Sequence, residues 1–266
     1  MKHIYFLIGF TLAILMTGCQ GAAVKVASPQ VEMQENPLGL QTLAPRFSWQ
    51  ISSGAQGVEQ AAYRMQVAQS EQELKNEKNL VWDSGIVEST ESVLIPYKGE
   101  ALSSREVYYW RVKAITNQGE TAWSKTGHWS MALINSSEWQ ARWIGEDSMS
   151  NPGETSQGNT RLAARYLRKP FESDHKVQRA VLYISGLGAY EAYINGKRVS
   201  EDLLAPTVSW YPERVYYNVH DVTSLIQKGN NAVGVKLGNG RFFGMRQSNT
   251  QMFGLPRLLA QLEIEY

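Results

Sequence analysis

The feature that most constrains the fold of this chain is a series of short strand patterns between residues 181 and 243. Over 190–194 an apolar side chain recurs at every second position, which places one set of side chains on a single face of an extended strand. Asn195-Gly196 follows at once, and this dipeptide signals a tight hairpin turn because both residues tolerate positive φ. The pattern predicts an antiparallel β-sandwich whose loops carry the polar and aromatic side chains.

The first half of the chain shows the same period of two. In 63–67, Arg64 and Gln66 separate three apolar positions, and 108–114 alternates in the same way. Such alternation predicts strands with one buried face and one face in water. Ser70 and Glu73 have the spacing of a capping box, which predicts a short surface helix over 71–78. The sequence therefore indicates an all-β chain.

Composition excludes several classes of function. The net charge is +1, so no nucleic-acid partner is indicated. Cys19 is the single cysteine, which rules out a disulfide within the chain and a thiolate zinc site. The four histidines lack the spacing of a metal-binding helix motif. Eight Trp and thirteen Tyr are the enriched class, and we expect most of them in sandwich cores.

The first nineteen residues have the form of an export signal. Lys2 supplies a positive start, 4–15 is an apolar run, and small residues lead to Cys19. The segment resembles a bacterial lipoprotein signal peptide, which implies that Cys19 is the lipidated N-terminus of a protein of the cell envelope, periplasmic or on the cell surface. The alternative is an ordinary secretory peptide with an incidental cysteine. The small and polar residues over 20–35 predict a tether.

An ordered set of motifs in the second half identifies a family. The chain contains NGKRV, then DVT, then LGNGRF, within the strand patterns described above. This order resembles the N-terminal jelly-roll domain of bacterial α-L-rhamnosidases, glycoside hydrolases that remove terminal rhamnose with inversion. Residues 138–266 would form that domain, and 36–134 resembles a fibronectin type III-like β-sandwich placed ahead of it. The resemblance implies an accessory region, because such enzymes hydrolyse their substrate on a helical barrel further along the chain.

The carboxyl end predicts an incomplete sandwich. Over 257–266 apolar residues alternate up to the last position, and about six strands follow residue 164, whereas a jelly roll has eight. An unfinished sandwich exposes an unpaired edge. We therefore expect an incomplete jelly-roll β-sandwich and a missing C-terminal catalytic domain.

No catalytic constellation is evident. Glycoside hydrolysis needs two carboxylates across the scissile bond, but Glu201 and Asp202 are neighbours and would point to opposite faces of a strand. The glycine pairs at 186–188 and 238–240 lack the following helix that dinucleotide binding requires. No catalytic residue is assigned.

A binding site remains the best prediction. Sugar binding needs an aromatic platform with donors and acceptors around it. The candidate residues lie in the loops: Asp202, Trp210, Tyr211, Arg214, Asn239 and Arg241. Each has a structural alternative: Asn239 as a turn residue, the two aromatic residues as packing, and Arg214 paired with Asp202. Calcium is a possible cofactor because some relatives use it, although no calcium-loop motif is present.

Three functions are consistent with these observations. In the first, the chain is the lipid-anchored N-terminal part of an α-L-rhamnosidase, and it supports the enzyme and binds rhamnose-containing glycans. The alternatives are a stand-alone surface glycan-binding lipoprotein and a purely structural spacer.

Overall fold

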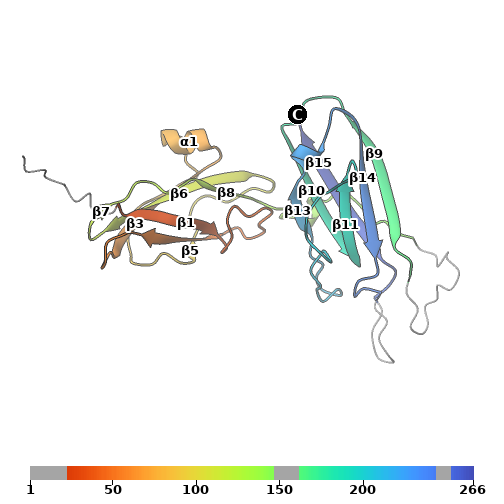
Figure 1. The fold of residues 1–266 in the computed structure, drawn as a ribbon, viewed down its shortest axis with the longest axis horizontal. Helices are drawn as coiled ribbons and strands as arrows, with labels where there is room; N and C mark the ends of the chain where they lie inside the picture. Colours follow the sequence, from red (N-terminus) through yellow and green to blue (C-terminus); the bar gives the residue numbers. More distant parts are fainter. Residues whose placement is uncertain (1–22, 147–161, 244–252) are drawn as a thin grey trace, which may run out of the picture.

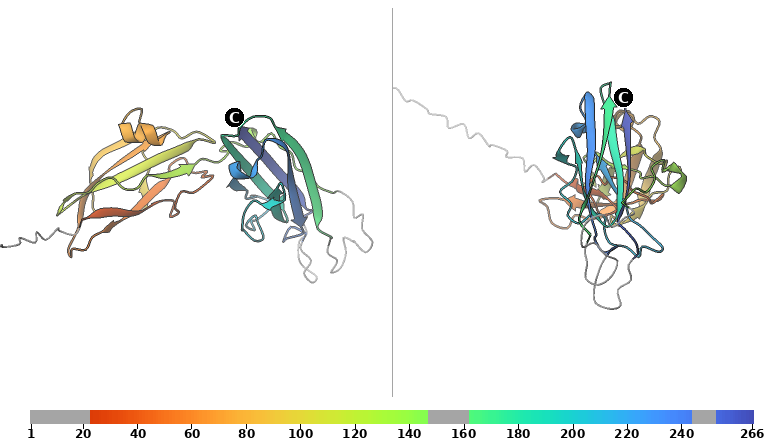
Figure 2. Two further views of the ribbon diagram at one scale, coloured as in Figure 1. Left: turned by 45° about the horizontal axis from the view of Figure 1, so that its top comes forward. Right: turned by 90° about the vertical axis from the view of Figure 1, so that its right-hand side faces the viewer.

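The computed structural model describes residues 23–146, 162–243 and 253–266. They form two β-sandwiches that lie end to end along the long axis of the molecule (Figure 1). We call residues 23–135 domain 1 and the described residues from 139 onward domain 2. The left view of Figure 2 shows the same separation, and the right view looks along the long axis, so that the two domains overlap. The all-β prediction is confirmed. Within the described ranges, no helix has the length and hydropathy that a membrane span requires.

Domain 1 is a sandwich of two antiparallel sheets. One sheet has the order β1-β2-β5, and the other has the order β4-β3-β6-β7 with β8 also paired to β6. Large aromatic side chains fill the space between the sheets, and Phe47, Trp110 and Trp129 are almost wholly buried. The elements are β1 (Lys25–Val31), β2 (Arg46–Ser52), β3 (Gln60–Ala68), α1 (Glu71–Asn76), β4 (Trp82–Glu88), β5 (Ile95–Pro96), β6 (Val107–Thr116), β7 (Gly119–Glu120) and β8 (Gly127–Ser130).

The first strand corrects the predicted tether over 20–35. From Lys25 to Val31 the chain pairs with β2 instead of running free. Val26 and Val31 are buried in the core of domain 1, which anchors the segment. A bulge between Ala27 and Gln30 interrupts the pairing, and Ser28 has a φ of 48°. The bulge breaks the period of two, which is why the sequence pattern did not reveal this strand.

The predicted cap of the short helix is confirmed, and its predicted end is not. The Ser70 hydroxyl accepts a hydrogen bond from the backbone N–H of Glu73 at 3.2 Å. The helix stops at Asn76 because Glu77 takes a left-handed conformation with φ 51°. Its Leu74 side chain is buried against the sheet.

The alternation predicted for β6 is confirmed, because its outward residues are half-exposed, but one outward residue of the neighbouring strand β3 is covered. Gln66, predicted on the water side, is fully buried. Its Oε1 accepts two hydrogen bonds from Arg111, at 3.0 and 2.7 Å. The Arg111 guanidinium lies 4.2 Å from the centre of the Trp123 ring. This cation–π stack shields the polar layer from solvent.

Domain 2 is also a sandwich, with sheets of order β13-β10-β15 and β12-β11-β14-β9. Asn195 and Gly196 both have positive φ and form the predicted hairpin between β11 and β12. A 3₁₀ turn, η1 (Ser136–Glu138), joins the domains. The remaining elements are β9 (Arg165–Ser173), β10 (Arg179–Leu187), β11 (Ala189–Ile194), β12 (Lys197–Arg198), β13 (Asn218–Asp221), η2 (Thr223–Leu225), β14 (Gly229–Gly238) and β15 (Arg257–Glu265).

The last strand, β15, forms one end of the three-stranded sheet and contributes apolar side chains to the core of domain 2. It pairs with β10 over its full length, from Arg179↔Glu265 to Leu187↔Arg257. Four alternate side chains face the core as predicted: Leu258, Ala260, Leu262 and Ile264. Tyr266 lies past the strand, half exposed, with its ring against His175. Seven strands are described in this domain, against about six predicted. That the sandwich is incomplete stays a prediction.

Polar contacts fix domain 1 to domain 2. Arg105 donates two hydrogen bonds to the Glu263 carboxylate, at 2.8 and 3.0 Å, and a third to Glu138 at 2.5 Å. The Tyr217 hydroxyl donates to the Leu133 carbonyl at 3.0 Å and accepts from Gln41 at 3.1 Å. Both groups of contacts join residues far apart in sequence, so they hold the two sandwiches in one arrangement.

Candidate functional site

Four aromatic rings gather where two loops of domain 2 meet. The Tyr211 ring stands edge-on to Phe242 at 5.1 Å and to Phe253 at 5.2 Å. Phe242 stacks on Phe253 at 5.9 Å, and Trp210 stands edge-on to Phe253 at 6.0 Å. Phe242 is buried, whereas Trp210 is 59% exposed. The aromatic cluster therefore has a packed base and one indole that faces solvent.

A tight turn holds the exposed indole in place. The Trp210 carbonyl accepts hydrogen bonds from the backbone N–H groups of Glu213 and Arg214, both at 3.0 Å. The Ser209 hydroxyl donates to the Arg214 carbonyl at 2.5 Å. The backbone of Arg214 is thus part of the turn, and Arg214 as a whole is exposed to solvent. No ion pair among the described residues joins Arg214 to Asp202, so that structural alternative is not supported.

Asn239 and Arg241 border the second loop of the aromatic cluster. The Asn239 amide donates to the Leu162 carbonyl at 3.1 Å, and its backbone carbonyl accepts from Phe243 N–H at 3.2 Å. These bonds favour the interpretation of Asn239 as a turn residue. Arg241 is exposed. Burial raises the pKa of Tyr211, and the nearby positive charge of Arg241 opposes that rise. Of the two predicted arginines, Arg241 is the one whose charge acts on the Tyr211 hydroxyl.

The two glycine pairs are packing sites. A β-carbon on Gly188 would lie 2.3 Å from the Gly238 carbonyl oxygen, and one on Gly240 would lie 2.6 Å from the Gly188 backbone. Only glycine permits this approach of two backbones. Gly188 leads directly into strand β11, as the sequence predicted. Among the described residues no helix follows either pair, so the structure gives no support to the nucleotide-binding interpretation.

Asp202 belongs to a different place from the aromatic cluster. It borders a cavity of about 10 Å³ together with Tyr190 and His220. Tyr190 is buried, and its hydroxyl has no hydrogen-bond partner among the described residues. Burial raises the pKa of Tyr190 and lowers the pKa of His220, and the charge of Asp202 acts on both groups. The volume suffices for about one water molecule, so this cavity is too small for a sugar.

The carboxylates at this cavity do not form a hydrolytic pair. Glu191 borders it beside Asp202, but its carboxylate accepts hydrogen bonds from the Tyr193 hydroxyl at 2.8 Å and from Lys236 at 3.1 Å. These bonds lower the pKa of Glu191. A general acid needs a raised pKa. Glu191 is therefore a surface ion-pair partner.

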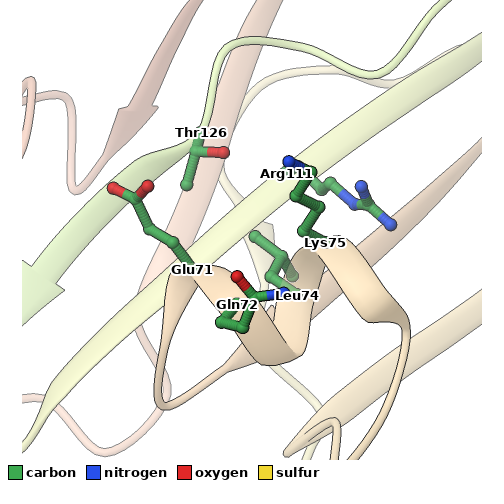
Figure 3. A pocket seen from close by; sticks show the side chains of 6 residues that line it. All are labelled: Glu71, Gln72, Leu74, Lys75, Arg111 and Thr126. Atoms are coloured by element: carbon green, nitrogen blue, oxygen red, sulfur yellow. The ribbon is translucent and has the colours of Figure 1, made fainter.

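Other features of the described residues offer no metal or catalytic site. No three His, Cys, Asp or Glu side chains gather within the described ranges, so these side chains give no support to the calcium that the resemblance suggested. A pocket of about 270 Å³ lies beside α1 in domain 1 (Figure 3). Arg111 lines it, but its guanidinium is turned to Gln66 and Glu77. Its titratable lining residues Glu71 and Lys75 are exposed on α1, as is typical of a solvated surface hollow.

Family models match both domains of the chain. Residues 26–135 match the N-terminal immunoglobulin domain of Rha78A-like proteins, and residues 175–266 match the α-L-rhamnosidase N-terminal domain. The chain matches the N-terminal region of α-L-rhamnosidases. The immunoglobulin-like match agrees with the predicted fibronectin-type sandwich, since both are antiparallel sandwiches of one architecture.

Whole α-L-rhamnosidases resemble the chain over almost all of its length. One from Formosa agariphila is 35% identical over 99% of this chain, and the chain covers 29% of that protein. The solved α-L-rhamnosidase from Dictyoglumus thermophilum superposes with a TM-score of 0.81 at 34% identity, covering 91% of this chain and 27% of the other. That from Streptomyces avermitilis, complexed with L-rhamnose, gives 0.80 at 25% identity, with 92% and 39% covered. The chain thus spans well under half of these α-L-rhamnosidases.

The structure brings together only part of the predicted site. Trp210 and Tyr211 share the aromatic cluster, with Asn239 and Arg241 at its border. Asp202 lies at the separate small cavity, and the Arg214 backbone serves the turn. Sequence reasoning missed Phe242 and Phe253, which form the base of the cluster. The apolar pair Phe242-Phe243, one residue after the glycine turn at 238–240, was the available signal for the first of them.

Proposed function

We propose that this chain is the N-terminal, non-catalytic part of an α-L-rhamnosidase that acts on terminal rhamnose with inversion. The observation that carries the proposal is the match of both domains to N-terminal domain families, together with 27% to 39% coverage of whole enzymes. In the proposal, hydrolysis belongs to a C-terminal catalytic domain. The two domains described here position that domain and contribute to glycan binding.

The aromatic cluster is the proposed contact with rhamnose-containing glycans. Trp210 presents more than half of its surface to solvent on a base of three packed rings. An exposed, rigid indole can stack on the apolar face of a sugar ring, and a guanidinium such as that of Arg241 can donate to hydroxyl groups. Asp202 is not included, because it lies at the small cavity.

Two assays test this division of roles. The chain, incubated with an aryl α-L-rhamnoside, should release no aryl alcohol. Measurable hydrolysis that survives purification would contradict the proposal. Isothermal titration with methyl α-L-rhamnopyranoside should show saturable binding that Trp210→Ala weakens at least about fivefold, because stacking supplies about 1 kcal/mol. Tyr166→Ala is the matched control, since Tyr166 is an aromatic residue 79% exposed on β9. Equal loss in both variants would reject the aromatic cluster.

The lipid anchor is a separate part of the proposal. Cys19 lies outside the described residues, and its support is the leader sequence alone. A lipidated Cys19 would place the protein in the cell envelope. In a bacterial host, the chain should fractionate with membranes and incorporate labelled palmitate, and Cys19→Ser should abolish both. A soluble, unlabelled protein with Cys19 intact would favour the ordinary secretory peptide.

A further inference from the structure

Domain 1 contains a cleft that the proposed function does not use. It lies between the edge strands β4 and β5, where the two sheets of the sandwich part, and its volume is about 380 Å³. This volume falls in the range of ligand pockets in proteins, roughly 300–1,000 Å³. Trp82, Val87 and Ile95 form its apolar floor and pack against the core of domain 1.

Hydrogen bonds fix the wall of the cleft. The buried Gln60 amide donates to the carbonyls of Ser89 and Glu91 at 3.1 and 2.9 Å. Its oxygen accepts from the Trp49 indole N–H at 2.9 Å. These three bonds tie the loop after β4 to the interior of the sandwich. The cleft is therefore preformed, and a ligand would not have to order it.

Several polar groups around the cleft are not engaged with the protein. The hydroxyl of Tyr63, a residue 6% exposed, has no hydrogen-bond partner among the described residues. Within the same ranges, the Trp82 indole N–H, the Glu91 carboxylate and the Lys98 ammonium also have none. Two neutral donors, one acceptor and one cation thus surround an apolar floor.

We propose that this cleft binds one pyranoside unit, as a second carbohydrate site in domain 1. A pyranoside combines an apolar ring face with hydroxyl groups that both donate and accept, which matches the floor and the four polar groups. A peptide strand is a poorer fit, because it would use the backbone edge of β4 and leave these side chains without partners. The site is independent of the aromatic cluster in domain 2.

The experiment uses the Trp210→Ala chain, so that failure of the domain 2 site does not affect the result. Saturation-transfer NMR and calorimetry would be run with methyl α-L-rhamnopyranoside, methyl α-D-glucopyranoside and methyl β-D-galactopyranoside. At least one should bind, and Glu91→Gln with Lys98→Ala should weaken it at least about tenfold, since bonds to charged groups are lost. Tyr63→Phe should weaken it about threefold to tenfold.

Matched variants separate binding from stability. Glu88→Gln and Lys78→Ala change exposed residues of the same types in domain 1 outside the cleft, and their affinity should equal that of the parent. The Glu91 and Lys98 changes affect exposed side chains, so the variants should fold. The proposal is overturned if none of the three glycosides binds, or if the cleft variants and the controls bind alike.

Discussion

Two tyrosines of domain 2, the buried Tyr190 and the half-buried Tyr217, show how the contribution of a hydroxyl group to stability depends on its hydrogen-bond partners. The Tyr190 hydroxyl is buried without a hydrogen-bond partner in the described part of the chain. The Tyr217 hydroxyl donates to Leu133 and accepts from Gln41. Burial of an unsatisfied hydroxyl costs free energy, whereas a satisfied one contributes to stability.

Removing each hydroxyl should therefore have different effects. Tyr190→Phe should leave the free energy of unfolding unchanged or raise it by up to about 1 kcal/mol. Tyr217→Phe should lower it by about 1 kcal/mol, because two bonds between the domains are lost. Urea denaturation monitored by fluorescence measures both. A clear loss in Tyr190→Phe would show that its hydroxyl has a partner, such as a water in the small cavity.

Asp83 makes domain 1 sensitive to acid. Hydrogen bonds from Arg64, reinforced by Gln66 and the Gly85 N–H, lower the pKa of Asp83 to about 2. Because the folded pKa lies below the unfolded value, the stabilisation is complete above pH 4 and is lost as the pH falls toward 2. The free energy of unfolding should drop by about 2 kcal/mol over that window. In Asp83→Asn, urea titrations should show lower stability at pH 7 and a smaller drop, whereas Asp174→Asn in domain 2 should keep the drop.

Some strands and turns of this chain can be predicted from neighbouring residues, and others cannot. The alternation in β6 and the Asn195-Gly196 hairpin were predictable, because side-chain period and turn chemistry are local properties. Strand β1 was not, because a bulge interrupts its period and its partner is distant in sequence. The close approach of the Gly188 and Gly240 backbones was not predictable either, because it results from the pairing of β11 with the distant strand β14.

Two glycines in domain 2 should respond differently to the same substitution. Gly196→Ala meets no atom within 4 Å and is strained only by its φ of 78°, so it should cost about 1 kcal/mol. Gly188→Ala would place its β-carbon against the Gly238 carbonyl and should cost at least about 2 kcal/mol. Midpoints of urea unfolding compare the two. Equal costs would mean that the contact between the glycine pairs relaxes easily.

On the scale of the whole molecule, Arg105 couples the two sandwiches. Its guanidinium joins Glu138 and Glu263, and its carbonyl accepts a hydrogen bond from Arg179 at 3.0 Å. The side chains of Arg105 and Glu263 are each about 30% exposed (32% and 29%). The bidentate geometry makes this a stronger contact than a typical surface ion pair.

Arg105→Ala should loosen the joint between the domains. We expect a loss of about 1–2 kcal/mol in stability and a broader distribution of overall dimensions in small-angle X-ray scattering. Lys125→Ala is the control, because Lys125 meets Glu35 at 3.9 Å with both side chains largely exposed. An unchanged scattering profile in Arg105→Ala would show that Tyr217 and its neighbours suffice to hold the domains.

The sequence by itself determined the all-β class, the two-domain order, the hairpin turn and the resemblance to the N-terminal region of α-L-rhamnosidases. Each of these depends on neighbouring residues or on motif order. Only the tertiary structure decided which loop residues meet: it joined Trp210 and Tyr211 to Phe242 and Phe253, and it separated Asp202 from them. The physical reason is that strand pairing brings distant loops together at one end of a sandwich, and no local pattern specifies that distance.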